Sequence, residues 1–382
     1  MRHHRAAVVL VVAALAASAA GCASGAGDGA VAGAATSTTA PAFAVTTSAP
    51  DTAAEAVADL VTAEGAPDEP GCAVGVAQAG TPIFRGGYGV ADLATGEPIG
   101  PTTTFDIASV SKQFTAAAVL LLADRGDLAL DDPVRRHVPE LPAADAAVTL
   151  EQLLHHTGGL PEYTELLGEE YDDTDVTTTA QALDAVAAAG GPVFTPGSEF
   201  EYSNTGYFLL GLVVARVAGV SLGTFVEREL FEPLGMDASV VRDDADLDVP
   251  EGAEGYLVTG DGGFEPDTTN WEQVGDGAVW TSVDDLLRWA DNLTTFAVGG
   301  AALRAGMLTP GPRPDDEEGL GYGGGLSLGG GFIEHSGAWA GFLSELVVVP
   351  ATDTAVVVLC NRDDAYPYDL AIEVLDVLDA GP

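Results

Sequence analysis

Strand-like segments lie at both ends of this chain, and helical patterns occupy the long region between them. Near the start, residues 71–78 (GCAVGVAQ) and 82–92 (PIFRGGYGVAD) are apolar and are separated by a turn-like AGT. Near the end, residues 331–335, 342–349 and 354–361 are strand-like, with PATD as a tight turn between the last two. These segments predict an α+β fold with a five-stranded antiparallel sheet built from both chain ends.

Helices are expected beside these strands and in the region between them. Residues 51–65 and 369–380 each carry an apolar stripe on one side. Residues 205–219 are apolar nearly all round, which is typical of a buried helix. We therefore expect one domain over residues 51–380. Its sheet part covers about 51–105 and 316–380, and its inserted helical part covers about 106–315.

The segment before this domain has the features of an export signal. A basic start, MRHHR, precedes a short apolar run, which predicts a signal peptide over residues 1–21. The run ends at AAGC, so Cys22 is the predicted lipidated first residue of a bacterial lipoprotein, although Ala19 replaces the usual leucine. Secretion without lipid is the alternative. Residues 22–50 are then a flexible tether, and the protein lies on the extracellular side of the membrane or is secreted.

The chain is strongly acidic. It contains 14 Lys and Arg residues against 58 Asp and Glu residues, a formal charge of −44. The charge becomes −46 in a protein without residues 1–21, because Arg2 and Arg5 leave with them. This charge disfavours nucleic acid and anionic membrane surfaces as partners. We expect a small-molecule or peptide substrate, membrane contact only through the lipid anchor, and a monomer.

Lys112 is the only lysine in the 382 residues, and Ser109 lies three positions before it. At the start of a predicted helix, this spacing places both side chains on one face. The N-terminus of the helix stabilises negative charge that develops on the serine oxygen. Burial against apolar residues disfavours the charged form of an amine, so Lys112 can take the serine proton. A chance pairing is the alternative, but the pattern is typical of a serine nucleophile with a lysine base.

Three motifs, in this order, resemble those of the class C β-lactamase and DD-peptidase-like serine hydrolases. The first is the serine-lysine pair in FDIASVSKQF, and the second is Tyr-x-Asn in EYSNTGY. The third is HSG in FIEHSGAW, a His-x-Gly variant of the Lys-Thr-Gly found in typical class C β-lactamases. The resemblance covers about residues 50–380. The motif residues are Ser109 and Lys112, then Tyr202 and Asn204, then His335, Ser336 and Gly337.

The resemblance implies a role for each motif. Ser109 would be the nucleophile, Lys112 its activating amine, and Tyr202 a base or a proton shuttle to the leaving group. Asn204 would donate a hydrogen bond to a substrate carbonyl. The third motif would lie on an edge strand facing the cleft, with its glycine letting substrate backbone approach. The expected substrate-binding residues are Asn204, His335, Ser336, Gly337 and Ala338, the N–H of Ala338 forming an oxyanion hole with that of Ser109.

The implied activity is hydrolysis of an amide or an ester through an acyl-enzyme on Ser109, with no metal and no cofactor. D-alanyl-D-alanine carboxypeptidase, D-aminopeptidase, esterase and class C β-lactamase share this mechanism, and the missing Lys-Thr-Gly disfavours the last. A non-enzymatic alternative is an inert lipoprotein that binds cell-wall peptide. No second lysine exists, and no arginine can be placed in the cleft from the sequence, Arg313 being the nearest along the chain. This predicts a preference for neutral substrates over those that carry a carboxylate.

Two further sets of residues have structural interpretations. If Cys22 carries lipid, Cys72 and Cys360 remain as an even pair in an oxidising compartment. The resemblance implies that their strands are antiparallel neighbours, so the pair forms either a disulfide or two buried free thiols. His155 and His156 end a predicted helix, where histidines cap carbonyls more often than they bind metal.

Overall fold

The computed structural model describes residues 51–380, apart from residues 169–175, 245, 246, 248, 250 and 313–320. The predicted signal peptide, the tether, Cys22 and Arg313 lie outside the described residues.

A seven-stranded antiparallel sheet forms the centre of the domain and confirms the predicted α+β class. The prediction of five strands missed two of the seven. The glycine-rich residues 321–329 carry no strand pattern in the sequence, but they pair with the sheet as two short strands. The strand with the third motif is therefore third from the edge. In spatial order the strands are β10 (Gly321–Tyr322), β11 (Ser327–Gly329), β12 (Phe332–Trp339), β13 (Phe342–Val349), β14 (Thr354–Cys360), β1 (Cys72–Gln78) and β2 (Thr81–Tyr88).

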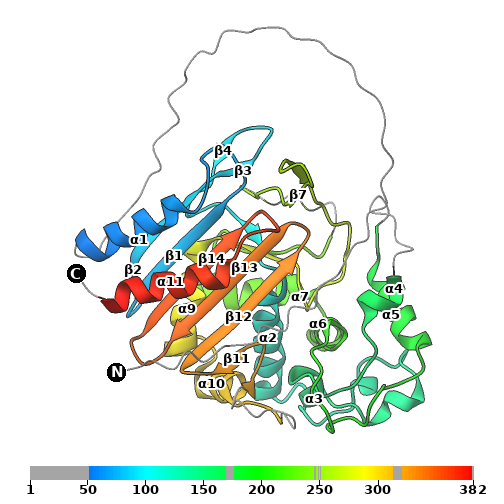
Figure 1. Cartoon of the computed structure of the whole chain (residues 1–382). Coiled ribbons are helices and arrows are strands. Elements are labelled where there is room, and N and C mark those ends of the chain that lie inside the picture. The colour runs from blue at the N-terminus through cyan, green and yellow to red at the C-terminus, as the bar shows by residue number, and fades with distance from the viewer. Residues whose placement is uncertain are drawn as a thin grey trace, which may run out of the picture. The chain divides into compact units, whose positions relative to one another are not determined.

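Helices cover both faces of this sheet. The first and last helices, α1 (Asp51–Ala63) and α11 (Pro367–Ala380), contact each other and lie on one face (Figure 1). Val74 and Val76 of β1 belong to the apolar cluster under these two helices. The alternate residues of β1 face the other side, where α9 (Val283–Thr295) packs closely enough that a Cβ on Gly75 would lie 3.0 Å from Leu287.

The helical part is built around two buried helices, α2 (Lys112–Arg125) and α6 (Asn204–Ala218), which contact each other. Residues from Lys112 to Leu122 are all buried, as the apolar sequence predicts, and α2 ends at Gly126 in the left-handed conformation. The other helices are α3 (Leu150–Leu154), α4 (Tyr163–Leu167), α5 (Thr179–Ala188), α7 (Leu222–Val226), α8 (Glu232–Leu234) and α10 (Gly300–Leu308), with 3-10 helices at Ala108–Ser111 (η1), Val134–Arg136 and Ala143–Ala147 and a π-helical turn at Glu227–Phe231.

Short strands connect the helical part to the sheet part. The three small sheets pair β3 (Val90–Asp92) with β4 (Glu97–Pro98), β5 (Phe105–Asp106) and β6 (Val240–Val241) with β9 (Val279–Thr281), and β7 (Tyr256–Val258) with β8 (Phe264–Pro266).

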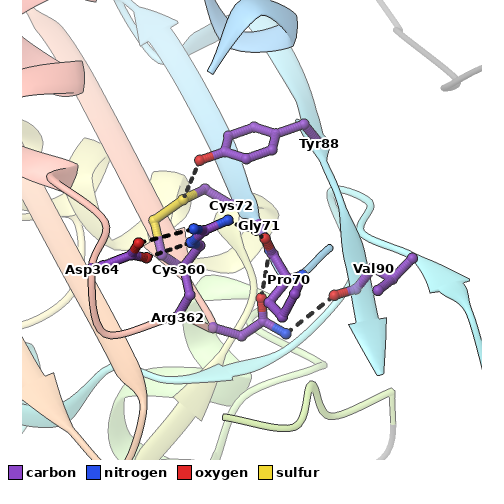
Figure 2. Close-up of a disulfide and its surroundings, with 9 residues drawn as sticks. Pro70, Gly71, Cys72, Tyr88, Val90, Cys360, Arg362 and Asp364 are labelled. Atoms are coloured by element: carbon purple, nitrogen blue, oxygen red, sulfur yellow. Dashed lines mark hydrogen bonds and ion pairs between the residues drawn. A yellow bond between two sulfur atoms is a disulfide. The ribbon is translucent and has the colours of Figure 1, made fainter. Parts of the chain in front are cut away.

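A disulfide bond joins Cys72 at the start of β1 to Cys360 at the end of β14, directly opposite each other in register. The two sulfur atoms are buried, and Figure 2 shows the Tyr88 hydroxyl directed at the bond, 3.2 Å from the Cys72 sulfur. Beside it, Arg362 pairs with Asp364. The bond ties together the two chain ends at β14 and β1, the fifth and sixth strands of the sheet.

Among the described residues, no helix is by itself long and apolar enough to cross a membrane. The helix Asn204–Ala218 meets the length and composition criteria only together with Leu222–Leu234, across a bend of 73°.

Candidate active site

Ser109 lies in η1, on a turn between β5 and α2 that several contacts hold in an unusual conformation. Ala108 has a φ of +46°, a region that residues with a Cβ rarely occupy. The Asp106 carboxylate accepts a hydrogen bond from the Ala108 N–H at 2.8 Å, and Ile107 donates its N–H to the Val279 carbonyl at 3.0 Å. The turn therefore presents the serine from a strained backbone that its neighbours fix in place.

Strand β12 lies directly behind this turn. A Cβ on Gly337 would lie only 2.3 Å from the Ile107 carbonyl oxygen. That same oxygen accepts a hydrogen bond from the Ser344 hydroxyl at 2.8 Å. The close approach of the Ile107 backbone therefore requires a glycine at position 337.

The structure brings Ser109, Lys112 and Asn204 together. The buried Lys112 Nζ lies 2.9 Å from Ser109 Oγ, 2.8 Å from Asn204 Oδ1 and 2.8 Å from the Asp276 carbonyl oxygen. The amide and carbonyl oxygens can only accept hydrogen bonds, whereas the serine hydroxyl can also donate. A neutral Lys112 would therefore donate to Asn204 and Asp276 and accept the hydrogen of Ser109.

Tyr202 and His335 lie on the other side of the lysine. The Tyr202 ring centroid is 5.0 Å from Lys112 Nζ and 6.2 Å from the His335 ring. Tyr202 is 42% exposed, so its ring borders both the lysine and solvent. Tyr322 and His156 complete this aromatic group, each with a ring centroid within 6.2 Å of that of Tyr202.

His335 is buried and hydrogen-bonded at both ring nitrogens. Nδ1 lies 2.6 Å from the Ser336 carbonyl oxygen, and Nε2 lies 2.9 Å from the Tyr322 hydroxyl. Because a carbonyl only accepts, Nδ1 carries the hydrogen and Nε2 accepts from Tyr322. Burial, together with the charge of Lys112, lowers the pKa of His335 to about 3. His335 is therefore neutral at ordinary pH. Ser336 itself is exposed on β12.

A cleft with an empty volume of about 610 Å³ opens beside the nucleophile. Ser109, Asn204 and Ala338 line it, as the resemblance implied for a substrate site. Both aromatic and charged or polar side chains line it. The same cleft is also lined by Trp271, Trp280, Trp339, Tyr163, Asp106, Asp276 and Arg242.

Three carboxyl groups of the site, those of Asp106, Asp276 and Glu162, have raised pKa values. Burial raises the pKa of Asp106 to about 7, although Arg242 and a bond from the Ala108 N–H act in the opposite direction. Burial also raises the pKa of Asp276, which the charge of Lys112 partly offsets. Tyr163 donates its hydroxyl hydrogen to Asp276 at 2.8 Å. Glu162 has a raised pKa, first from burial and then from Asp276, and accepts the Asn204 N–H at 2.9 Å.

The sequence did not identify Arg242, Asp276 or the tryptophans as site residues. No arginine could be placed in the cleft from the sequence, and the structure shows that Arg242 lines it, just after β6 and far from every motif along the chain. Asp276 acts on Lys112 through its backbone carbonyl, which no side-chain pattern can signal. Trp271, Trp280 and Trp339 line the cleft, whereas Trp289, which lies among them in the sequence, is buried in the core, so position along the chain did not distinguish them.

The model of the Beta-lactamase family matches residues 57–379, so the chain belongs to this family. It is 28% identical over 314 residues to penicillin-binding protein 4* of Bacillus subtilis, covering 78% of this chain and 69% of that protein. The next curated relatives are matched over only 44% of their length. Fold, motifs and family together identify the chain as a serine hydrolase related to the penicillin-binding proteins.

Two solved structures of similar fold extend this comparison. The octameric penicillin-binding protein homologue of Pyrococcus abyssi has a TM-score of 0.75 at 26% identity, covering 86% of this chain and 77% of that one. A D-stereospecific amidohydrolase from Streptomyces sp. has a TM-score of 0.71 at 26% identity, covering 85% of this chain and 98% of that one. Because one of these neighbours is octameric, the monomer expected here stays a prediction.

Proposed function

We propose that this protein hydrolyses an amide or an ester through an acyl-enzyme on Ser109. The observation that carries the proposal is the 2.9 Å contact between Lys112 Nζ and Ser109 Oγ at the wall of the cleft. Lys112 takes the hydroxyl proton as the serine oxygen bonds to the substrate carbonyl carbon. The leaving amine or alcohol departs with a proton, and water then attacks the acyl-enzyme and releases the acid.

The neighbouring residues support this chemistry in different ways. Asn204 holds Lys112 through Oδ1, which leaves its amide N–H groups to donate to a substrate carbonyl. Tyr202, beside the lysine, is the group we assign to proton transfer to the leaving group. The backbone N–H groups of Ser109 and Ala338 are the proposed oxyanion hole, since both residues line the cleft.

The cleft favours a substrate with a large apolar group. Trp271 and Trp339 pack edge to face with ring centroids 5.2 Å apart, and Trp339 is 36% exposed. Aromatic walls of this kind suit an aromatic or bulky side chain better than the methyl group of alanine. We therefore favour an amidase or esterase for such substrates. D-alanyl-D-alanine carboxypeptidase and class C β-lactamase are the alternatives, the latter disfavoured by a neutral His335 where Lys-Thr-Gly has a cation.

We also propose that the mature protein works outside the cell, held by a lipid on Cys22 or freely secreted. The apolar run before Cys22 and the Ala-, Gly-, Ser- and Thr-rich composition of residues 22–50 support this placement. A location outside the cell is an oxidising environment, in which the disulfide between Cys72 and Cys360 would persist. Mass spectrometry of the mature N-terminus separates the two forms, because only a lipoprotein carries acyl chains on Cys22.

The substrate proposal is tested with the amides of phenylalanine and alanine, each as D and L enantiomers. We expect kcat/KM to be at least about tenfold higher for one phenylalanine amide than for either alanine amide. Trp339→Ala should remove most of this difference while leaving the alanine amides within about threefold. Tyr366→Ala is the matched control, because Tyr366 is an exposed aromatic residue that does not line the cleft. A wild-type preference for alanine would contradict the assignment.

A further inference from the structure

His156 holds the backbone on both sides of Tyr202. The carbonyl oxygen of His156 accepts the N–H of Glu201 at 2.9 Å. Its side-chain Nδ1 accepts the N–H of Ser203 at 3.1 Å. One residue on a distant loop therefore anchors the two neighbours of the tyrosine, one through its main chain and the other through its side chain.

The His156 ring also packs against the Tyr202 ring. Their centroids are 4.4 Å apart with an interplanar angle of 39°. His156 is itself only 1% exposed and lies between Tyr207 and Tyr322, with centroid distances of 5.1 and 4.4 Å. Tyr202 is 42% exposed, so part of its ring is not held by protein contacts. Packing against the buried His156 ring therefore limits the rotation of the Tyr202 side chain.

The backbone of His156 is strained to make these contacts. Helix α3 ends just before it, and His156 has a φ of +56°, a conformation that residues with a Cβ rarely adopt. Glycine or asparagine usually occupies such a position after a helix. The sequence predicted that this histidine caps the helix. Its N–H does donate to the Leu153 carbonyl of α3 at 3.3 Å, whereas its own carbonyl and its Nδ1 bind residues 201 and 203.

The contact with Ser203 requires a neutral imidazole. A backbone N–H can only donate, so His156 Nδ1 accepts and the ring hydrogen lies on Nε2. Among the described residues, Nε2 has no hydrogen-bond partner and is buried. Burial, followed by the charge of Lys112, holds the pKa of His156 well below its usual range. The acceptor at Nδ1 is thus kept available.

We infer that His156 is a positioning residue for Tyr202, fixing the tyrosine ring beside Lys112 for proton transfer to the leaving group. The inference rests on the proposed function, because it gives Tyr202 a role in turnover. In this role, His156 itself does not contact the substrate. Its effect therefore passes through Tyr202, and a perturbation of His156 should matter only while the tyrosine hydroxyl is present.

Two substitutions that suit a positive φ separate the side chain from the backbone. His156→Gly removes the Ser203 acceptor and the ring, whereas His156→Asn places an amide oxygen close to where Nδ1 lies. We expect His156→Gly to lower kcat about 10–100-fold with KM changed less than threefold, and His156→Asn to restore at least about fivefold of that loss. His155→Asn is the matched control, because the His155 side chain hydrogen-bonds through Nδ1 to the Tyr322 carbonyl and not to a neighbour of Tyr202 along the chain, and it should stay within about threefold of wild type.

A double-mutant cycle with Tyr202→Phe decides whether the effect passes through the tyrosine. In the Tyr202→Phe background, His156→Gly should change kcat less than twofold. If it lowers kcat there by the same factor as in the wild type, or if asparagine restores nothing, the positioning role is wrong. If Tyr202→Phe alone retains full turnover, the assigned role of Tyr202 fails and the positioning role fails with it. Fluorophosphonate labelling of Ser109 in each variant shows that the nucleophile is intact.

Discussion

The Nζ atom of Lys112 and the Oγ atom of Ser109 lie 2.9 Å apart, one turn from each other at the start of α2. The other two oxygens within hydrogen-bonding distance of this amine, from Asn204 and Asp276, can only accept. The serine hydroxyl is therefore the one partner of the three from which the amine can accept a proton.

Replacing Lys112 by arginine should nearly abolish acylation. A guanidinium keeps its proton at any working pH, so it can donate to the same oxygens but cannot take the serine proton. We expect the acylation rate with an aryl ester to fall at least about 1,000-fold while the melting temperature shows that the fold persists. Arg216→Lys, a cation swap on the surface beside Glu140, serves as control. Substantial acylation by the arginine variant would show that another group is the base.

Arg242 should select substrates by charge. It is the one side chain with a permanent positive charge among the described residues that line the cleft, and guanidinium groups bind carboxylates well. Arg242→Gln should lower kcat/KM about tenfold for a substrate that carries a carboxylate and less than threefold for its methyl ester. Equal losses for both would assign Arg242 a structural role only.

The same substrate pair tests the effect of the overall charge. The net charge of −44 repels anions most strongly at low salt. Turnover of the carboxylate should therefore rise relative to the ester as salt is added. A ratio that stays constant from low to high salt would show that long-range repulsion does not reach the cleft.

Asp106 should make stability depend on pH. Its folded pKa of about 7 lies above its ordinary value of 3.8, so the folded state binds a proton more tightly than the unfolded chain. The resulting stabilisation is complete below about pH 4 and is lost as pH rises through about 7. Relative to Asp106→Asn, the wild type should lose up to about 1.4 kcal/mol of unfolding free energy per pH unit in this window. Urea unfolding at a series of pH values measures the difference, with Asp59→Asn, at an exposed carboxyl on α1, as the control.

The disulfide between Cys72 and Cys360 should protect both thiols and stabilise the domain. Alkylation of the denatured, unreduced protein should leave both cysteines unmodified. Replacing both by alanine should lower the unfolding free energy by about 2–4 kcal/mol, because the bond restricts the unfolded chain between the two ends. Two free thiols in the oxidised, secreted protein would contradict the bond.

The sequence predicted those parts of the fold that depend on local pattern. The strands β12, β13, β14, β1 and β2 and the buried helices α2 and α6 follow from runs of apolar residues with strand or helix periodicity. Strands β10 and β11 were missed because Gly-rich residues carry no such pattern and pair only through their backbone. Whether such residues form a strand depends on pairing with a neighbouring strand, and this pairing cannot be read from a short segment of sequence.

The candidate site divides in the same way. Ser109 and Lys112 could be paired from the sequence because both lie on one helical turn. Tyr202 and His335 required the family resemblance, since nothing local brings them to the lysine. Arg242 was missed because its place in the cleft depends on how β6 pairs with β9. The role of His156 was missed because it is expressed through backbone hydrogen bonds to residues 201 and 203.

The most direct test is to locate the covalent adduct on the protein. The mature protein is incubated with a fluorophosphonate and, separately, with a penicillin, then digested and analysed by mass spectrometry. We predict that the fluorophosphonate adds one label, on the peptide containing Ser109, and that Ser109→Ala removes it while the penicillin adduct, if formed, maps to the same serine. A label on any other residue, or one that survives in Ser109→Ala, would contradict the assignment of Ser109 as the nucleophile.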